Sequence, residues 1–407
     1  MQDTKKLLFE LIRGEVCGTS KEACAGETVA QADTQNVENA PPAEACDKLE
    51  SETLAGLYAI SKAHDMAHLL AEALDKRGLL GEAASEGNSF LKQRQMAVYR
   101  YEQINYEYER LCNAFEHNQI IHVPLKGALI RKLYPEPWLR TSCDIDILVP
   151  EAELKKAVEV CETKLGYKTE GKAYHDISML SPGGVHLELH FNVCENIQAL
   201  DEVLGRAWDY AIPVEGKKYE KKFTNEYFIF HNVAHASYHF LSGGCGIRSV
   251  LDLWLLRHKT VYEEAKVKEL CAACGLEKFY DSLVLLSQVW FSGAEGNGLT
   301  DKMEKFILDG GVYGTIENGL SAKPSKKSGK SKYLFSLIFL PYKDMKAIHP
   351  VLGKHKWLLP FFHIGRWFKI LFRGISPRTK RAMRVNAKIS DEDRKKVGKL
   401  LEELELL

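Results

Sequence analysis

Asp144 and Asp146 are separated by one residue within Asp144–Val149, a run that reads DIDILV. The apolar and β-branched residues of this run predict a strand, in which successive side chains point to opposite faces. Both carboxylates therefore point the same way, while Ile145 and Ile147 point into the core. Two carboxylates so close repel each other, and a divalent cation between them removes the repulsion. A strand edge that simply carries two exposed acids is the other interpretation, and it is common.

A third carboxylate lies on a second alternating run, Val185–His190 (VHLELH). Glu188 shares one face of this run with His186 and His190, and two leucines occupy the other face. A Ser-Pro-Gly-Gly turn precedes the run, which predicts a hairpin with His175–Leu180. A third acid on a neighbouring strand is what a site for two metal ions needs.

Lys126 and Gly127 lie at a turn between a short predicted strand and a short predicted helix. Glycine allows the backbone to approach a ligand closely, and a helix N-terminus favours an anion such as a triphosphate. Arg140 and Ser142 precede the acid pair, within reach of phosphate oxygens. These residues predict a phosphate-binding side of the site.

Three histidines, His231, His235 and His239, recur every fourth residue on one face of a predicted helix. They could bind zinc, but we favour the interpretation that this face packs against another part of the protein. We expect His239 to face the site, because a glycine-rich stretch follows it. Arg248 either pairs with Asp252, one helical turn further on, or reaches nucleotide phosphate; of these we favour the ion pair.

The elements around these residues predict an α+β fold, with a small mixed sheet between helical segments. One amphipathic helix is expected over Leu54–Leu79, and helices again over Asn225–Ser292. We divide the chain into an N-terminal helix (1–13), a disordered acidic insert (14–52), a helical segment (53–118), a sheet-bearing core (119–215), a helical domain (216–315), and a basic linker with a C-terminal helical region (316–407).

The composition is that of a globular protein, with 55 basic residues against 55 acidic ones in 407 residues. The N-terminus has no continuous apolar run typical of a signal peptide, and no stretch reaches the roughly 18 apolar residues of a membrane span. The 10 cysteines are scattered, which favours reduced thiols. We therefore expect a cytoplasmic protein without a transmembrane segment.

The segment Ser321–Ser390 is strongly basic, with 17 Lys or Arg against one acid, Asp344. Aromatic residues such as Trp357 and Phe361 are interleaved with these charges. Such a segment could contact RNA, DNA or an anionic membrane surface. Alternatively, its aromatic face packs onto the rest of the protein and its lysines are solvated. Both interpretations stay open.

The runs LKGALIRKLYP, LRTSCDIDILV and VHLELHF together resemble the DNA polymerase β-type nucleotidyltransferase superfamily. Within that superfamily they look like the branch of uncharacterised nucleotidyltransferases. The later run HASYHFLSGGCGIRSVLDLW is similar to the Gly-x-Arg...Asp stretch of the same branch. The resemblance spans about Leu54–Tyr313 and implies a polymerase β-like nucleotidyltransferase core.

The resemblance implies transfer of a nucleoside monophosphate from an NTP to a hydroxyl acceptor, with pyrophosphate released. It implies two Mg²⁺ or Mn²⁺ ions bound by Asp144 and Asp146, with Glu188 on the ion nearer the acceptor and able to take its proton. Lys126 and Arg140 would hold the triphosphate. The residues expected to bind the nucleotide are Lys126, Gly127, Arg140, Ser142, His190, His239 and Arg248.

The acceptor is not specified by these motifs: a small molecule, a sugar, an RNA end or a protein hydroxyl would fit. Two other functions remain as alternatives. One is a degenerate member that binds nucleotide or a partner without turnover. The other is a nucleic-acid or membrane-surface protein directed by the basic segment. The set of three acids favours the enzyme.

Overall fold

The computed structural model describes residues 2–17, 49–80, 85–312, 314–315, 318–319, 339–342, 345–346, 349–373 and 389–407. Most of the disordered insert predicted over 14–52, and most of the basic linker predicted from residue 316, lie outside the described residues. At its ends the insert prediction is wrong. Arg13–Cys17 form a helical turn with Val16 buried in the core, and the next helix already begins at Ser51.

Five strands form one mixed sheet in the order β1-β2-β5-β4-β3. The central neighbours β2 and β5 are parallel, and the other neighbouring pairs are antiparallel. The predicted α+β class is confirmed, as are the strand over Asp144–Val149 and the hairpin of β4 and β5. The strands are β1 (Val123–Pro124), β2 (Asp144–Leu148), β3 (Lys168–Lys172), β4 (Asp176–Leu180) and β5 (His186–His190).

Two helices cover one face of this sheet, α4 (Ser85–His117) and α6 (Leu154–Lys164). Against them pack the apolar residues of the central strands, among them Ile145, Ile147 and Leu187, which are almost completely buried. Because side chains alternate along a strand, the acids of β2 and β5 take the opposite face. The alternation of apolar and acidic residues therefore determines which face of the sheet carries the acids.

The opposite side of the molecule is helical, as predicted for Asn225–Ser292. Helices from both ends of the described chain share one hydrophobic core there, in which Phe9 stacks on Trp290 with ring centroids 4.5 Å apart. These helices are α1 (Gln2–Ile12), α2 (Ser51–Ala63), α3 (Ala67–Asp75), α8 (Asn225–Ser242), α9 (Ile247–Lys259), α10 (Glu264–Ala273), α11 (Glu277–Ser292), α12 (Gly298–Gly310) and α18 (Asp391–Glu403).

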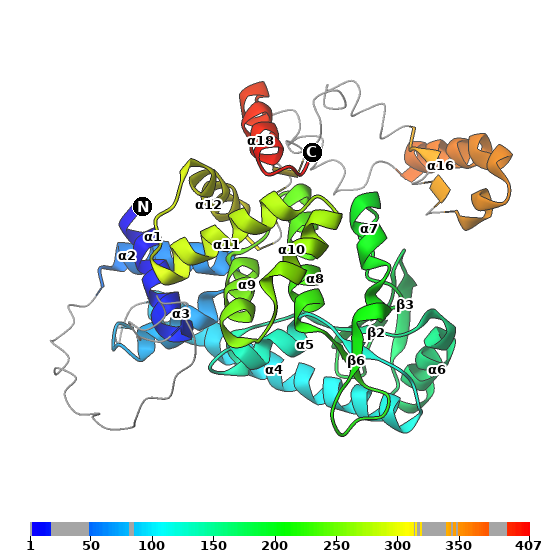
Figure 1. Ribbon diagram of the computed structural model, residues 1–407, viewed down its shortest axis with the longest axis horizontal. Coiled ribbons are helices and arrows are strands. Elements are labelled where there is room, and N and C mark those ends of the chain that lie inside the picture. Colours follow the sequence, from blue (N-terminus) through cyan, green and yellow to red (C-terminus); the bar gives the residue numbers. More distant parts are fainter. Residues whose placement is uncertain are drawn as a thin grey trace.

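The long helix α4 connects the two sides. At 1.5 Å per residue it is about 50 Å long, and it contacts α2 and α3 near its start and α6 near its end (Figure 1). Helix α16 (Leu359–Arg373) is drawn apart from the helices around the sheet (Figure 1). The shorter elements are α5 (Gly127–Ile130), α7 (Gln198–Leu204), β6 (Ala211–Pro213), β7 (Lys221–Phe223) and the short helical turns η1 (Arg13–Cys17), η2 (Arg131–Leu133), η3 (Pro137–Leu139), η4 (Glu151–Glu153), η5 (Ala207–Tyr210), η7 (Pro350–Gly353) and η8 (Lys356–Leu358).

One predicted helix is wrong. The segment Leu54–Leu79 forms two helices, α2 and α3, because the chain turns at Asp65, whose φ of 55° is incompatible with a continuous helix. Strand β3 was not predicted, since all five of its residues are exposed and none carries an apolar side chain.

Within the described residues, no helix combines the length and the apolar character needed to cross a bilayer.

A buried ion pair joins the sheet side to the helical side. The Arg140 guanidinium, in the segment before β2, donates from Nη2 to Asp252 Oδ2 of α9 at 2.8 Å, and its Nε lies 3.1 Å from both carboxylate oxygens. The Tyr134 hydroxyl donates to Asp252 Oδ1 at 2.8 Å. The predicted pair of Arg248 with Asp252 is therefore wrong, because Arg140 takes that carboxylate.

Removing Arg140 should destabilise the whole protein. In Arg140→Leu the Asp252 carboxylate stays buried with only Tyr134 as a partner, and breaking such a pair costs about 3–5 kcal/mol. Urea unfolding followed by far-UV circular dichroism measures this loss. Asp309→Asn is the control, because it breaks an exposed ion pair with Lys305 and should change little. A decrease in the free energy of unfolding below about 1 kcal/mol in Arg140→Leu would show that the pair does not stabilise the contact between the two sides.

Candidate functional site

A cavity of about 410 Å³ lies between the acid-bearing face of the sheet and helices α8 and α9. Each predicted site residue lines this cavity, although the residues are spread over more than one hundred positions of the chain. They are Lys126, Gly127, Arg140, Ser142, Asp144, Asp146, Glu188, His190, His239 and Arg248. The structure therefore brings the whole predicted set together, and their individual contacts differ from residue to residue.

The carboxylates of Asp146 and Glu188 lie on adjacent parallel strands, at the same level of the sheet. With His190 they form a group in which one ligand atom from each residue lies within 4.8 Å of the others. Asp144 lies two residues earlier on the same face of β2, where it is half-buried. The three acids therefore meet at one wall of the cavity.

Asp146 is buried and has two basic neighbours. Lys126 Nζ lies 3.4 Å from Asp146 Oδ1, and His190 Nε2 lies 3.0 Å from the same oxygen. Burial alone would raise the pKa of Asp146, but Lys126 and His190 outweigh burial and hold that pKa well below its ordinary value. Asp146 is therefore ionised throughout the pH range in which the protein is handled.

Asp144 has the opposite environment. Burial, and then the negative charges of Asp146 and Glu188, raise the pKa of Asp144 to about 6. At neutral pH this carboxylate is ionised against an unfavourable local potential. A divalent cation at this wall would remove that penalty, because it would attract all three acids at once.

Lys126 reaches the acids from a strained backbone. Its φ of 39° lies in a region that non-glycine residues rarely adopt, and such conformations are concentrated at functional sites. Glycine at the next position gives Arg140 room, since a Cβ at Gly127 would lie 2.7 Å from Arg140 Nη1 and the guanidinium would have to move. Helix α5 has only four residues, so its dipole adds little and an anion must be held mainly by side chains.

Arg140 and Ser142 are both engaged within the protein. Arg140 uses Nε and Nη2 to bind Asp252, so only Nη1 can point toward a phosphate. Ser142 Oγ accepts a hydrogen bond of 2.6 Å from Arg131 Nη2, and Arg131 Nε also donates to the carbonyl oxygen of Gly127. The first role of these groups is to fix the loop around Gly127.

The helical wall carries the histidines of α8. His235 Nδ1 lies 2.8 Å from Glu195 Oε1, and His235 Nε2 lies 3.0 Å from His239 Nε2. All three histidines, His231 included, line the cavity. The prediction that their face packs against another part of the protein is wrong for His235, because the sheet stands across a cavity from it, whereas His239 lines the cavity as we expected.

Arg248 lies at the start of α9, where the turn after α8 brings it to the cavity. It donates from Nη1 to the carbonyl oxygen of Thr141 at 2.9 Å and to Asp65 Oδ2 at 3.2 Å. The turn depends on Gly243, whose φ is 132° and where a Cβ would lie 2.6 Å from the carbonyl oxygen of Thr315. Arg248 therefore has a fixed position, in which it lines the cavity.

Two site residues were missed by the sequence interpretation. Glu195 pairs with His235, and His175 stacks on His190 with ring centroids 5.4 Å apart. Glu195 follows the end of β5 by five residues. Because the carboxyl ends of the parallel strands β2 and β5 meet at one edge, the loop after β5 was a place to look. No sequence pattern marked His175.

The charges around the cavity do not suit a free triphosphate. Its lining contains five acids and three basic residues, a surplus of two negative charges with the histidines neutral. A nucleoside triphosphate carries a large negative charge of its own, so it would be repelled. Cations bound at the acid wall would reverse this balance.

A family model described as an uncharacterised nucleotidyltransferase matches residues 50–292, more than half of the chain. The matched range ends with α11 and contains each of the predicted site residues. No curated protein and no solved structure matches the chain. The resemblance inferred from the sequence motifs is thus confirmed at the level of this family.

Two isosteric substitutions should have opposite effects on the stability of the metal-free protein at pH 7.5. The folded state raises the pKa of Asp144, so ionised Asp144 destabilises it, and this cost grows as the pH rises through about 6. Asp144→Asn should therefore stabilise the protein by about 1–3 kcal/mol. The folded state lowers the pKa of Asp146, so Asp146→Asn should destabilise it by about 3 kcal/mol.

Urea unfolding in EDTA measures both effects. Glu170→Gln is the control, because Glu170 lies on the exposed strand β3. If both cavity variants shift the stability in the same direction, the electrostatic account of this wall is wrong.

Proposed function

The chain belongs to the uncharacterised nucleotidyltransferase family, and from that premise we propose that it transfers a nucleoside monophosphate from an NTP to a hydroxyl acceptor, releasing pyrophosphate. The family supports a role in nucleotidyl transfer. The observation that carries the specific proposal is the wall of three carboxylates, Asp144, Asp146 and Glu188, across the cavity from the cationic and histidine side chains of α8 and α9. We also propose that the core belongs to the polymerase β-type superfamily, which this arrangement of acids supports.

The donor atoms suit magnesium or manganese. Mg²⁺ prefers oxygen ligands and usually takes few carboxylates from the protein together with phosphate oxygens of the substrate. We propose that Asp144 and Asp146 hold two such ions and that Glu188 holds the one nearer the acceptor. Bound there, the ions would neutralise charge that develops on the phosphate.

The side chains of the chain itself have separate tasks in this proposal. His190 orients Asp146 through the 3.0 Å contact. Lys126, now paired with Asp146, would turn to the triphosphate once cations neutralise that carboxylate. Arg248 approaches the phosphates from α9. Glu188 remains about 39% exposed and can accept the proton of an acceptor hydroxyl that enters from the cavity mouth.

The cavity size is compatible with a nucleotide. A volume of about 410 Å³ lies within the roughly 300–1,000 Å³ range of small-molecule sites. The acceptor can be a small molecule, a sugar, an RNA end or a protein hydroxyl. The three acids do not select among these, since each offers a hydroxyl group. The proposal therefore names the donor and the reaction, and leaves the acceptor as a class.

A degenerate protein that binds nucleotide without turnover is the second candidate. Two contacts favour it: Lys126 lies beside the acid that should bind metal, and Arg140 is committed to Asp252. In this second candidate, both contacts would remain in place while a nucleotide is bound. The second candidate predicts nucleotide binding that does not depend on Asp144.

The basic C-terminal region adds a proposed anionic partner. Trp357 and Phe361 are 68% and 63% exposed, in a segment rich in lysine and arginine. Exposed aromatics among basic side chains suit phosphate-bearing surfaces. We also propose a cytoplasmic location, in line with the free thiols of the eight described cysteines.

Label transfer tests the proposed reaction. Wild-type protein, each α-labelled NTP, Mg²⁺ or Mn²⁺ and a cell lysate should give a labelled acceptor with at least one NTP. Asp144→Ala combined with Asp146→Ala should lower the rate by about 1,000-fold or more, because several kcal/mol of charge stabilisation is lost.

Glu170→Ala serves as the matched control for this experiment, since it removes an acid from the same sheet outside the cavity. It should label as wild type does. Equal labelling by wild type and the double variant would refute the proposal. Nucleotide binding without any labelling would favour the second candidate.

A further inference from the structure

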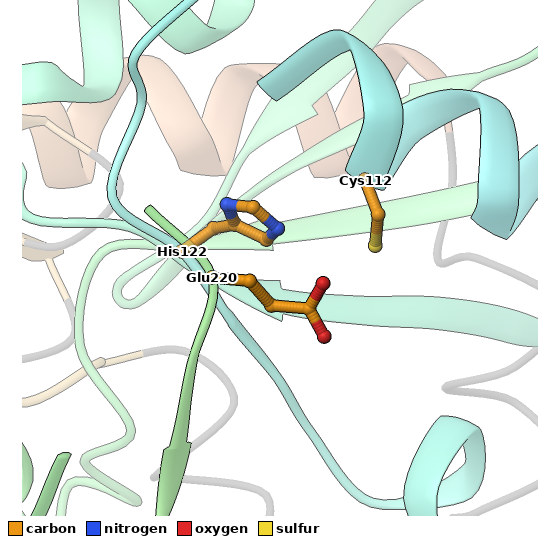
Figure 2. Close-up of side chains that lie close together, drawn as sticks. All are labelled: Cys112, His122 and Glu220. Atoms are coloured by element: carbon orange, nitrogen blue, oxygen red, sulfur yellow. The ribbon is translucent and has the colours of Figure 1, made fainter. Parts of the chain in front are cut away.

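A second group of metal-ligating side chains lies outside the nucleotide cavity. It consists of Cys112 near the end of α4, His122 just before β1, and Glu220 just before β7. One ligand atom from each lies within 4.8 Å of the other two. Figure 2 shows the imidazole, the thiol and the carboxylate directed toward a common space between the three segments.

His122 is oriented as a ligand. It is completely buried, and its Nδ1 lies 2.9 Å from the carbonyl oxygen of Ile120, to which it donates as an N–H. With the proton on Nδ1, Nε2 carries a free lone pair, and this atom has no hydrogen-bond partner among the described residues. Metal-ligating histidines typically use one nitrogen to hold a backbone carbonyl and the other to bind the ion.

The backbone around these residues is firmly held. The His122 N–H donates to the carbonyl oxygen of Tyr219 at 3.1 Å, and the Lys221 N–H donates to the carbonyl oxygen of His122 at 2.8 Å. The Glu116 carboxylate of α4 accepts three further hydrogen bonds, from the N–H groups of residues 218, 219 and 220. The hairpin of β6 and β7 is therefore fastened to α4 and to the sheet edge before any ion binds.

Cys112 and Glu220 complete the group chemically. Burial, and then the nearby Glu220 carboxylate, raise the pKa of the Cys112 thiol to about 12, with the Tyr108 hydroxyl beside the sulfur. A cation between the thiol and the carboxylate would reverse this effect and leave a thiolate. Lys217 Nζ lies 3.9 Å from Glu220 Oε2, and it can turn to solvent.

We propose that Cys112, His122 and Glu220 bind one zinc ion, with a water molecule as the fourth ligand. A set of sulfur, nitrogen and oxygen donors suits zinc and not magnesium. In a tetrahedral zinc site, bond lengths of about 2.0–2.3 Å place the ligand atoms about 3.5 Å apart, so modest side-chain rotations close the site. The ion would pin the β6–β7 hairpin to the sheet that carries the acid wall.

Metal analysis of the full-length chain tests this site. Protein made without a metal-affinity tag and dialysed against a weak chelator should retain about one zinc per chain. Cys112→Ser and Glu220→Gln should weaken zinc binding at least about 100-fold. Cys161→Ser is the matched control, because it replaces another buried thiol of the same hydrophobic cluster, on α6, and should retain the zinc.

Cobalt substitution adds a readout whose wild-type measurement does not require a variant to fold. Co²⁺ in wild-type protein should produce a near-ultraviolet thiolate-to-cobalt charge-transfer band, which Asp146→Asn and Cys161→Ser retain and Cys112→Ser loses. Cobalt bound without that band lies elsewhere, such as at Asp146, Glu188 and His190. Absence of the band in wild-type protein, or its persistence in Cys112→Ser, overturns the proposal.

Discussion

The repulsion among three carboxylates at one wall of a cavity is the constraint on which this structure depends. Asp144, Asp146 and Glu188 share the polar face of two parallel strands because the other face is packed against α4 and α6. Lys126 and His190 neighbour Asp146, whereas burial and then the charges of Asp146 and Glu188 raise the pKa of Asp144. The wall is thus suited to cations, which would relieve the repulsion and attract a triphosphate to a cavity that otherwise repels it.

Helices α8 and α9 form the opposite side of the cavity, and contacts with the loop before β2 hold them there. Arg140 pairs with Asp252, and Arg248 donates to the carbonyl oxygen of Thr141, so two contacts with α9 fix that loop. Gly127 permits the close approach of Arg140. The residues around the cavity that are engaged in these contacts therefore maintain its shape. The side chains that remain available to a ligand are Lys126, the acids, the histidines of α8 and part of Arg248.

Much of this site was accessible from the sequence because its signals are local. The alternation in DIDILV and VHLELH indicates which side chains share a face of each strand, and the turn before VHLELH predicts its hairpin with the preceding strand. The contacts between distant segments were not accessible. Asp252 has two basic residues within reach, and only the folded chain shows that Arg140, 112 residues away, is its partner. The break at Asp65 and the site around Cys112 depend on tertiary contacts in the same way.

The central claim is that cations at the acid wall make the cavity a nucleotide site. Calorimetric binding of a non-hydrolysable NTP analogue to the full-length chain, in Mn²⁺ and in EDTA, measures this most directly. The account predicts binding at least about 100-fold tighter with Mn²⁺, equal to about 2.7 kcal/mol, and loss of this dependence in Asp144→Asn combined with Asp146→Asn. Equal affinity in Mn²⁺ and in EDTA would contradict it.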